Sequence, residues 1–226
     1  MRELPDISYQ YDETFIKYMH EQIWECKKDI NVYHALAKIE FSHFYDHIET
    51  PKDILEVGSG LGRGTIYLNK FLNDVSASFT LADRTGYTNN TGVFNPKKDE
   101  YYNDLSLTKK FCELNGVNNV KTFDTELDDW SKLKKFDFIF SLCSFGMHVK
   151  IERYMERLLS VSKESTIMIF GVRDDSYTEN SFIDLFEHVI YRKYTDINPV
   201  YKENWLILKY PKIIGDENAN AAASAT

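Results

Sequence analysis

The spacing of hydrophobic positions changes near residue 50. Before that point apolar residues recur every three or four positions, which is the period of a helix that buries one face. After it, short apolar runs alternate with stretches of helical period. The two early helical sets are Phe15, Ile16, Met19, Ile23 and Trp24, and Leu36, Ala37, Phe41, Phe44, Tyr45 and Ile48. The pattern predicts N-terminal helices followed by alternating strands and helices.

Short apolar runs of this kind are typical of buried strands, and strands that alternate with helices indicate a parallel sheet covered on both faces. The runs are 53–57, 78–83, 120–124, 136–142, 166–172 and 204–210, the last expected to pair with the stretch before it. Helices are predicted at 63–73, 105–114, 151–159 and 181–190, and Gly116 suits a left-handed cap after the second of these. We expect an α/β fold with a doubly wound, mostly parallel sheet, whose ligands bind at the carboxyl ends of the strands.

The chain of 226 residues contains no internal repeat and no linker rich in proline or glycine, which favours one domain. We expect residues 1–50 to form a helical cap within the same domain as residues 51–213. The low-complexity segment 214–226 is expected to be a disordered tail.

Composition and charge exclude several classes of binding partner. A net charge of −8 offers no basic surface for nucleic acid or for an anionic membrane. Neither a signal peptide nor a membrane-spanning run is visible, so we expect a cytoplasmic protein. The three cysteines, Cys26, Cys112 and Cys143, are scattered and never spaced as C-x-x-C, which argues for reduced thiols and against a structural zinc site.

A glycine-rich turn follows the first strand, in the segment Glu56-Val-Gly58-Ser-Gly60-Leu-Gly62. The dinucleotide fingerprint G-x-G-x-x-G would need a third glycine at Arg63 or Thr65, so the spacing disfavours a nicotinamide dehydrogenase. A pyrophosphate would also be repelled by Glu56, whereas a cationic cofactor would tolerate that carboxylate. A glycine turn kept only for packing is the alternative.

This segment resembles the first motif of the class I S-adenosylmethionine-dependent methyltransferases, and the resemblance extends from about residue 52 to 175. It implies a Rossmann-like sheet of seven strands with S-adenosylmethionine as the cofactor. Asp83 occupies the position whose carboxylate binds the ribose hydroxyls, and Asp124 the position that receives the adenine amino group. The cofactor-binding residues that it implies are Glu56, Gly58, Ser59, Gly60, Gly62, Arg63, Asp83, Arg84, Asp124, Thr125 and Ser141. Without the resemblance, Asp83 could be a turn or cap residue and Asp124 a solvated loop carboxylate.

The motif after the fourth strand limits which kinds of methyl acceptor are expected. It lacks the Asn/Asp-Pro-Pro-Tyr of DNA and glutamine methyltransferases, and it lacks the strand-end aspartate of metal-dependent catechol-type enzymes, so we expect no metal. It does contain His148, whose imidazole titrates near neutrality and could remove the proton of a hydroxyl nucleophile. His148 is the predicted catalytic base, with a helix-capping role as the alternative. His34, His43 and His47 are minor candidates.

A narrower resemblance, to bacterial sugar O-methyltransferases, is carried by the segments 102–111, 114–117 and 144–148. It implies a small-molecule acceptor, with a sugar favoured. The predicted acceptor-binding residues are Tyr101, Tyr102, Arg173 and Asp174. A small-molecule N-methyltransferase and a non-catalytic module that binds S-adenosylmethionine remain alternatives, and a homodimer is left open.

Overall fold

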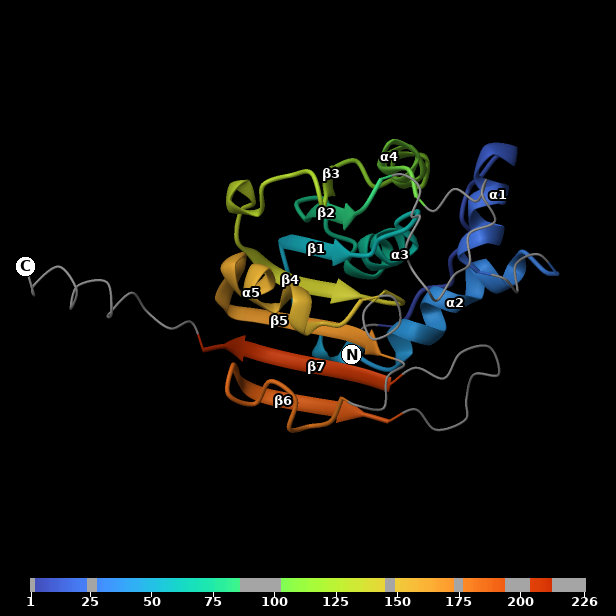
Figure 1. The fold of residues 1–226 in the computed structure, drawn as a ribbon. Coiled ribbons are helices and arrows are strands. Elements are labelled where there is room, and N and C mark those ends of the chain that lie inside the picture. The colour runs from blue at the N-terminus through green and yellow to red at the C-terminus, as the bar shows by residue number, and fades with distance from the viewer. Residues whose placement is uncertain are drawn as a thin grey trace, which may run out of the picture.

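The computed structural model describes residues 3–23, 28–85, 103–144, 149–172, 177–193 and 204–212. Figure 1 shows how its elements are arranged. They are α1 (Glu13–Gln22), α2 (Asn31–Ser42), η2 (Tyr45–His47), β1 (Asp53–Val57), α3 (Arg63–Leu72), β2 (Ser78–Asp83), α4 (Leu105–Leu114), β3 (Val120–Asp124), η3 (Trp130–Lys132), β4 (Phe136–Ser141), α5 (Glu152–Ser160), β5 (Ser162–Val172), β6 (Phe186–Arg192) and β7 (Asn204–Pro211).

The strands form one seven-stranded sheet in the order β3-β2-β1-β4-β5-β7-β6. Strands β1 to β5 pair in parallel, and β7 lies antiparallel between β5 and β6. In Figure 1 the arrow of β7 accordingly points against those of its neighbours. The order reverses between β1 and β4, which is the switch point where open α/β sheets bind ligands. The predicted fold class is confirmed.

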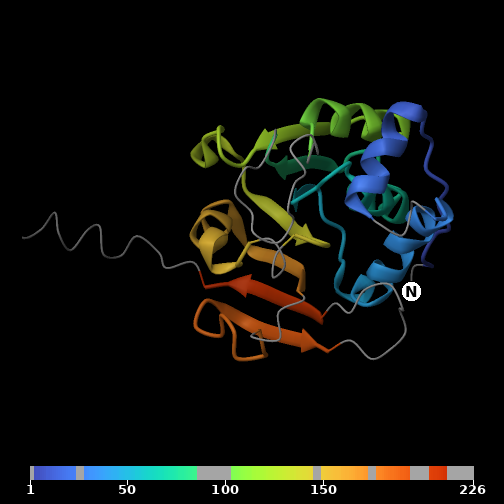
Figure 2. The same cartoon turned by 45° about the vertical axis from the view of Figure 1, so that its right-hand side comes forward.

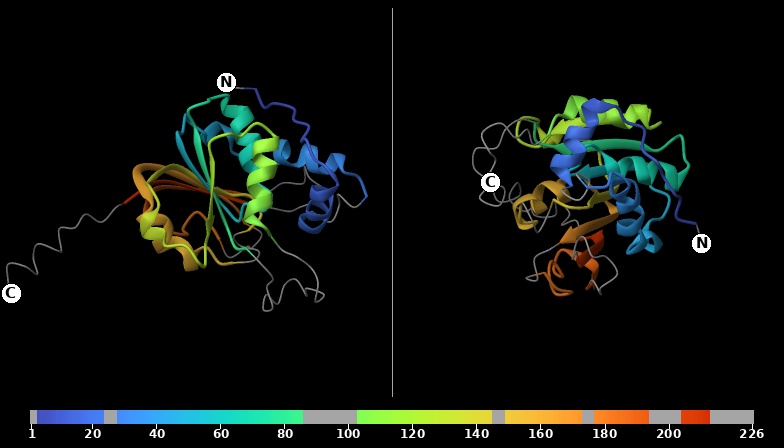
Figure 3. Two further views of the ribbon diagram at one scale, coloured as in Figure 1. Left: turned by 90° about the horizontal axis from the view of Figure 1, so that it is seen from above. Right: turned by 90° about the vertical axis from the view of Figure 1, so that its right-hand side faces the viewer.

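Two hydrophobic cores cover the two faces of the sheet. One contains side chains of α2, α3 and α4, including Phe41, Tyr67 and Phe111. The other contains side chains of α5, including Tyr154 and Leu158. Figure 2 and the right-hand view of Figure 3 show α5 on one side of the sheet and α2 and α3 on the other. Both faces are therefore buried, as the near-continuous apolar strands predict.

The N-terminal helices lie beyond the carboxyl ends of the parallel strands (Figure 1). Helix α1 begins where the Asp12 side chain accepts a hydrogen bond from the Thr14 N–H at 2.9 Å, an ordinary N-cap. The apolar face of α2 is buried, as its spacing predicts. The Tyr67 hydroxyl of α3 donates to the Pro5 carbonyl at 3.0 Å. The cap is thus packed against the edge of the sheet where a ligand is expected.

Most predicted elements agree with the structure, and the predicted helix at 181–190 is wrong. Phe186 to Arg192 form strand β6, which pairs with β7. Apolar residues at 182, 183, 185, 186, 189 and 190 have helical spacing, but long-range pairing with β7 outweighs this local pattern. Gly116 has a φ of +83° after α4, which confirms the left-handed cap.

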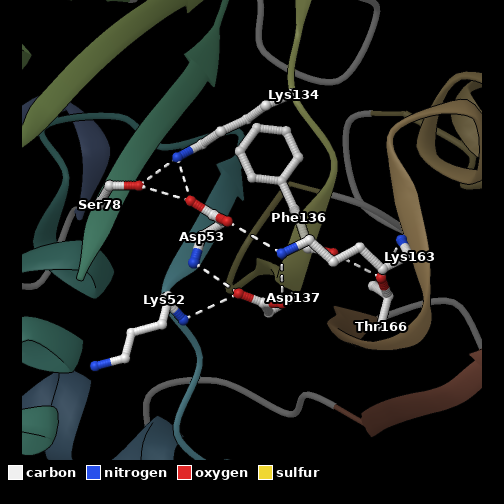
Figure 4. Close-up of polar contacts among 8 residues, drawn as sticks. All are labelled: Lys52, Asp53, Ser78, Lys134, Phe136, Asp137, Lys163 and Thr166. Carbon is white, nitrogen blue, oxygen red and sulfur yellow. Dashed lines mark hydrogen bonds and ion pairs between the residues drawn. The ribbon is translucent and has the colours of Figure 1, made fainter. Parts of the chain in front are cut away.

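At the opposite, amino edge of the sheet, lysines and aspartates tie four strands together (Figure 4). Lys163 Nζ contacts Asp53 at 3.0 Å and Asp137 at 2.7 Å. Lys134 Nζ donates to both Asp53 and Ser78. Asp137 also accepts the backbone N–H groups of Lys52 and Asp53, at 3.0 and 2.9 Å. Both aspartates are therefore paired with cations.

The expected disordered tail, 214–226, lies outside the described residues. Among the helices that the structure describes, none has the length and apolar character that crossing a bilayer requires.

Candidate functional site

The glycine turn between β1 and α3 adopts a backbone that side chains would disturb. Gly58, Gly60 and Gly62 have φ values of +68°, +54° and +81°, in the left-handed region that favours glycine. A Cβ on Gly58 would lie 2.1 Å from the Cβ of Ser144, in the segment that follows β4. The Gly58 N–H donates to the Ala82 carbonyl at 2.8 Å. The turn therefore packs against the ends of both β2 and β4.

Glu56 lies at the base of this turn and is buried. Its Oε2 accepts the backbone N–H of Thr65 at 3.0 Å, which caps the first turn of α3. A Cβ on Gly64 would lie 2.5 Å from Glu56 Oε1, so glycine is needed to admit the carboxylate. Burial raises the pKa of Glu56 to about 8, against the hydrogen bond from Thr65 and the charge of Arg63, which lower it. With this pKa the carboxyl group is largely protonated at neutral pH, even with the Arg63 charge acting on it.

Two further carboxylates lie side by side where β2 and β3 end. Asp83 and Asp124 are direct partners in the strand register. Asp83 accepts the N–H groups of Gly60 at 2.8 Å and Arg84 at 2.7 Å. Asp124 accepts those of Thr85 at 3.1 Å, Glu126 at 3.0 Å and Leu127 at 3.1 Å. Both are mostly buried, so Asp124 is not the solvated loop residue that the alternative interpretation describes.

Burial also raises the pKa of Asp83, to about 6, and the charge of Asp124 adds to that rise. The N–H groups of Gly60 and Arg84 act in the opposite direction. Each Asp83 oxygen accepts one of these bonds, and a carboxylate offers about four acceptor positions. Two positions therefore remain for donors of a ligand, such as a pair of neighbouring hydroxyls.

Buried hydroxyl groups without a hydrogen-bond partner surround the turn. Among the described residues these include Ser59 Oγ in the turn and Ser141 Oγ at the end of β4. Unpaired polar groups in protein interiors are uncommon and costly. Groups left unpaired at the carboxyl ends of β1 and β4 are available to a polar ligand at the edge of the sheet where such folds bind ligands.

The remaining predicted cofactor residues differ in what they face. Thr125 donates its N–H to the Asp83 carbonyl at 2.9 Å and so joins the ends of β2 and β3. The Arg84 charge lowers the pKa of Asp83. The Arg63 side chain points to the N-terminal cap, where it pairs with Glu40 of α2. Burial by itself lowers the pKa of Arg63, but the charge and hydrogen bonds of Glu40 raise it above its ordinary value.

Several predicted site residues lie outside the described residues. They are the predicted base His148 and the predicted acceptor-binding residues Tyr101, Tyr102, Arg173 and Asp174. Of the minor candidates, His34 accepts the Tyr9 N–H at 2.9 Å, and His47 Nε2 lies 2.7 Å from the Arg192 guanidinium. These two rings therefore already have partners within the protein.

Sequence reasoning missed two residues that shape the turn. Thr108 of α4 donates its hydroxyl to the Gly60 carbonyl at 2.6 Å. Glu40 reaches the turn through Arg63. Glu40 carried a visible signal, because it is a charged residue between the buried positions Ala37 and Phe41 of an amphipathic helix. Thr108 carried none, since a threonine in a helix has many ordinary roles.

Among the residues that the structure describes, no group of three or more His, Cys, Asp or Glu side chains is arranged to hold a metal ion.

Comparison with known proteins places this architecture in one class. The chain has the fold of the class I S-adenosylmethionine-dependent methyltransferases. No protein-family model and no curated protein matches the sequence.

Three solved structures illustrate the likeness. The O-methyltransferase TomG from Streptomyces achromogenes, involved in tomaymycin synthesis and solved in complex with SAM, has a TM-score of 0.52 at 14% identity, over 90% of this chain and 92% of that chain. Precorrin-6y C5,15-methyltransferase from Geobacter metallireducens GS-15 has a TM-score of 0.50 at 11% identity, over 78% and 88%. TYW2 from M. jannaschii, in complex with AdoMet, has a TM-score of 0.50 at 15% identity, over 78% and 77%. At these identities the likeness concerns the fold.

Proposed function

We propose that the protein is an S-adenosylmethionine-dependent methyltransferase that acts on a hydroxyl group of a small molecule, with a sugar as the favoured acceptor. The observation that carries the cofactor is the arrangement of Asp83 beside the glycine turn. Asp83 holds the Gly60 N–H at 2.8 Å and keeps acceptor positions for two hydroxyls. Structures with the same fold, among them TomG and TYW2, are complexes with this cofactor.

The other residues of the site fit the same cofactor. Gly58 and Gly60 have no Cβ that would obstruct a ligand at the turn. Asp124 lies next to Asp83 and would receive the adenine amino group. Burial opposes the charged forms of Glu56 and Asp83, and a cationic sulfonium nearby would favour those charged forms.

The acceptor side of the proposal rests on sequence. When bound, S-adenosylmethionine would supply an electrophilic methyl group, and S-adenosylhomocysteine would leave as the acceptor oxygen bonded to that group and lost its proton. His148, in the segment that follows β4, is the proposed base for that proton. Tyr101 and Tyr102 would stack against the apolar faces of a sugar, and Arg173 and Asp174 would bind its hydroxyls. No metal ion takes part in the proposed reaction.

Calorimetric titration with S-adenosylmethionine and S-adenosylhomocysteine, with NADH as the control, tests the cofactor. We expect micromolar binding of the first two and none of NADH. Absence of binding by a folded protein would overturn the cofactor assignment. A protein that binds S-adenosylmethionine but never converts it, with any sugar or amine offered, would be a binding module instead.

Substitution of His148 tests the class of acceptor. For hydroxyl acceptors, His148→Ala should lower the methylation rate on the order of 10²-fold or more, because the base is lost. For a small amine, which can bind already neutral, the same substitution should change the rate little. A rate unaffected by His148→Ala would therefore favour N-methylation.

A further inference from the structure

A buried ion pair joins the N-terminal helices to the glycine turn. The side chains of Glu40 and Arg63 are only 4% and 10% exposed. Arg63 Nη2 donates to Glu40 Oε1 at 2.8 Å, and Arg63 Nη1 donates to Glu40 Oε2. Arg63 directly follows Gly62 and is the first residue of α3. Helix α2 therefore binds the first side chain after the three glycines.

Apolar packing already holds α2 in the core. The helix already buries Tyr33, Leu36, Ala37 and Phe41 in the core. Moving two charges out of water is costly, and a buried ion pair often stabilises a fold no more than apolar residues of the same shape. The contribution of the pair is therefore better sought in the geometry that it imposes.

The contacts around the pair reach both sides of the switch point. The Tyr9 hydroxyl donates to the Arg63 carbonyl at 3.1 Å, and the Arg63 guanidinium lies 5.9 Å from the centre of the Tyr33 ring. Glu40 Oε1 lies 3.9 Å from the sulfur of Cys143, which follows β4. One carboxylate thus contacts the turn after β1 and the segment after β4.

These two segments also contact each other. The Ser144 side chain occupies the space that a Cβ on Gly58 would fill. A small displacement of the turn relative to the segment after β4 would close or widen this contact. A bidentate carboxylate–guanidinium pair has a fixed geometry and resists such a displacement.

We propose that Glu40 is a positioning residue of the cofactor site. Acting through Arg63, it holds the glycine turn against the segment after β4 in the conformation that binds S-adenosylmethionine. The inference rests on the proposed function, because S-adenosylmethionine is the ligand whose site Glu40 shapes. It makes the N-terminal cap part of the binding site and not only a cover over it.

The test separates positioning from stability. In the double variant Glu40→Leu/Arg63→Met, both charges are replaced by apolar side chains of similar size, so the fold should be retained. The control is Lys163→Met, which removes two ion pairs at the opposite edge of the sheet. For each protein we would measure thermal unfolding, amide hydrogen exchange of residues 58–65, and calorimetric binding of S-adenosylmethionine.

In the double variant we expect an unchanged unfolding temperature, faster exchange at Gly58, Gly60, Gly62 and Thr65, and binding weakened roughly 5- to 150-fold. All four of these N–H groups donate hydrogen bonds in the wild type, so their exchange reports on the turn. Lys163→Met should change neither exchange at the turn nor binding. Unchanged exchange and unchanged binding in the double variant would overturn the proposal.

Two further results remain interpretable. If the wild-type protein binds no S-adenosylmethionine, the proposed function fails, and the exchange rates alone decide whether Glu40 holds the turn. If the double variant does not fold, Glu40→Gln replaces it, since glutamine keeps one acceptor oxygen for Arg63. Glu40→Gln should then show a smaller acceleration of exchange at the turn, and no acceleration would overturn the proposal.

Discussion

The pKa values of carboxyl groups are shifted in opposite directions at the two edges of the sheet. At the amino edge, burial alone would raise the pKa values of Asp53 and Asp137, but hydrogen bonds lower both, from Lys134 and Lys163 to Asp53 and from Lys163 to Asp137. At the carboxyl edge, burial prevails, and the pKa of Glu56 rises to about 8 and that of Asp83 to about 6. The same sheet thus has carboxylates paired with lysines at one edge and carboxylates whose charge burial opposes at the other.

The amino edge thus contributes to stability, whereas the carboxyl edge holds the candidate site. Paired carboxylates at the amino edge hold strands together, and lysines of the same protein neutralise their charge. Buried carboxylates and unpaired hydroxyls at the carboxyl edge cost stability until a ligand satisfies them. Such unsatisfied groups are tolerated at functional sites because the rest of the fold compensates for them.

The largest effect is expected for Glu56→Gln, in the pH dependence of its stability relative to the wild type. The pKa of Glu56 is raised in the folded state, so its contribution is favourable below its ordinary value of 4.5 and is lost as the pH rises to about 8. The substituted glutamine would stay neutral, so the variant should gain stability relative to the wild type over this window, by at most about 4 to 5 kcal/mol. Urea unfolding at pH 5, 7 and 8.5 measures the difference, and a constant difference across this range would contradict the raised pKa.

Gly58→Ala should disturb the carboxyl edge next most strongly. The substitution adds a left-handed non-glycine residue and a Cβ within 2.1 Å of Ser144, which together should cost about 3 kcal/mol. It should also abolish binding of S-adenosylmethionine. Gly116→Ala is the matched control, because Gly116 has a φ of +83° but nothing within 4 Å of an added Cβ. Equal unfolding free energies for the two variants would show that the contact with Ser144 is unimportant.

Asp83→Ala should weaken binding of S-adenosylmethionine about 10²-fold, because two hydrogen bonds to a charged acceptor are lost. Asp129→Ala changes an exposed carboxylate after β3 and should leave binding unchanged. For the wild type, binding should also weaken as the pH falls below about 6, since a protonated Asp83 offers fewer acceptor positions. Calorimetry from pH 5 to 7.5 measures both effects, and a flat profile would argue against a binding role for Asp83.

The smallest effect is expected at the amino edge. Lys163→Met removes partly exposed ion pairs, so it should cost about 1 kcal/mol or less at pH 7. The pKa values of Asp53 and Asp137 are lowered in the fold, so this stability is present above 3.8 and is lost as the pH falls through their folded values. The stabilities of the wild type and the variant, measured by urea unfolding, should therefore converge as the pH falls below 3.8. A difference that persisted there would point to packing and not to charge.

The fold was predictable where local pattern and tertiary context agree. The apolar runs at 53–57 and 120–124 became β1 and β3 without change, because local pattern and sheet pairing favour the same extended conformation there. The prediction for β6 was wrong because β6 is an edge strand whose apolar residues are spaced as in a helix. Only its partner β7, which follows it along the chain, determines that it is extended.

The candidate site shows the same division. The glycine spacing and Asp83 could be read from sequence because they follow strands directly. The charge of Glu40 on the apolar face of a helix was visible, but its role was not, since its partner Arg63 lies 23 positions away and belongs to another element. Contacts between elements leave little trace in a single sequence.

The order of the strands also bears on how the chain reaches its final state. Ser78 and Asp53, which join β2 to β1, are 25 positions apart, whereas Asp53 and Asp137, which join β1 to β4, are 84 apart. Closing the longer loop costs more chain entropy, so β1 to β3 should assemble before β4 joins them. In such a partly folded chain the glycine turn and Asp83 would be in place, but Ser141 and Ser144 would not yet lie beside them. A ligand that binds at the switch point would therefore recognise only molecules that have finished folding.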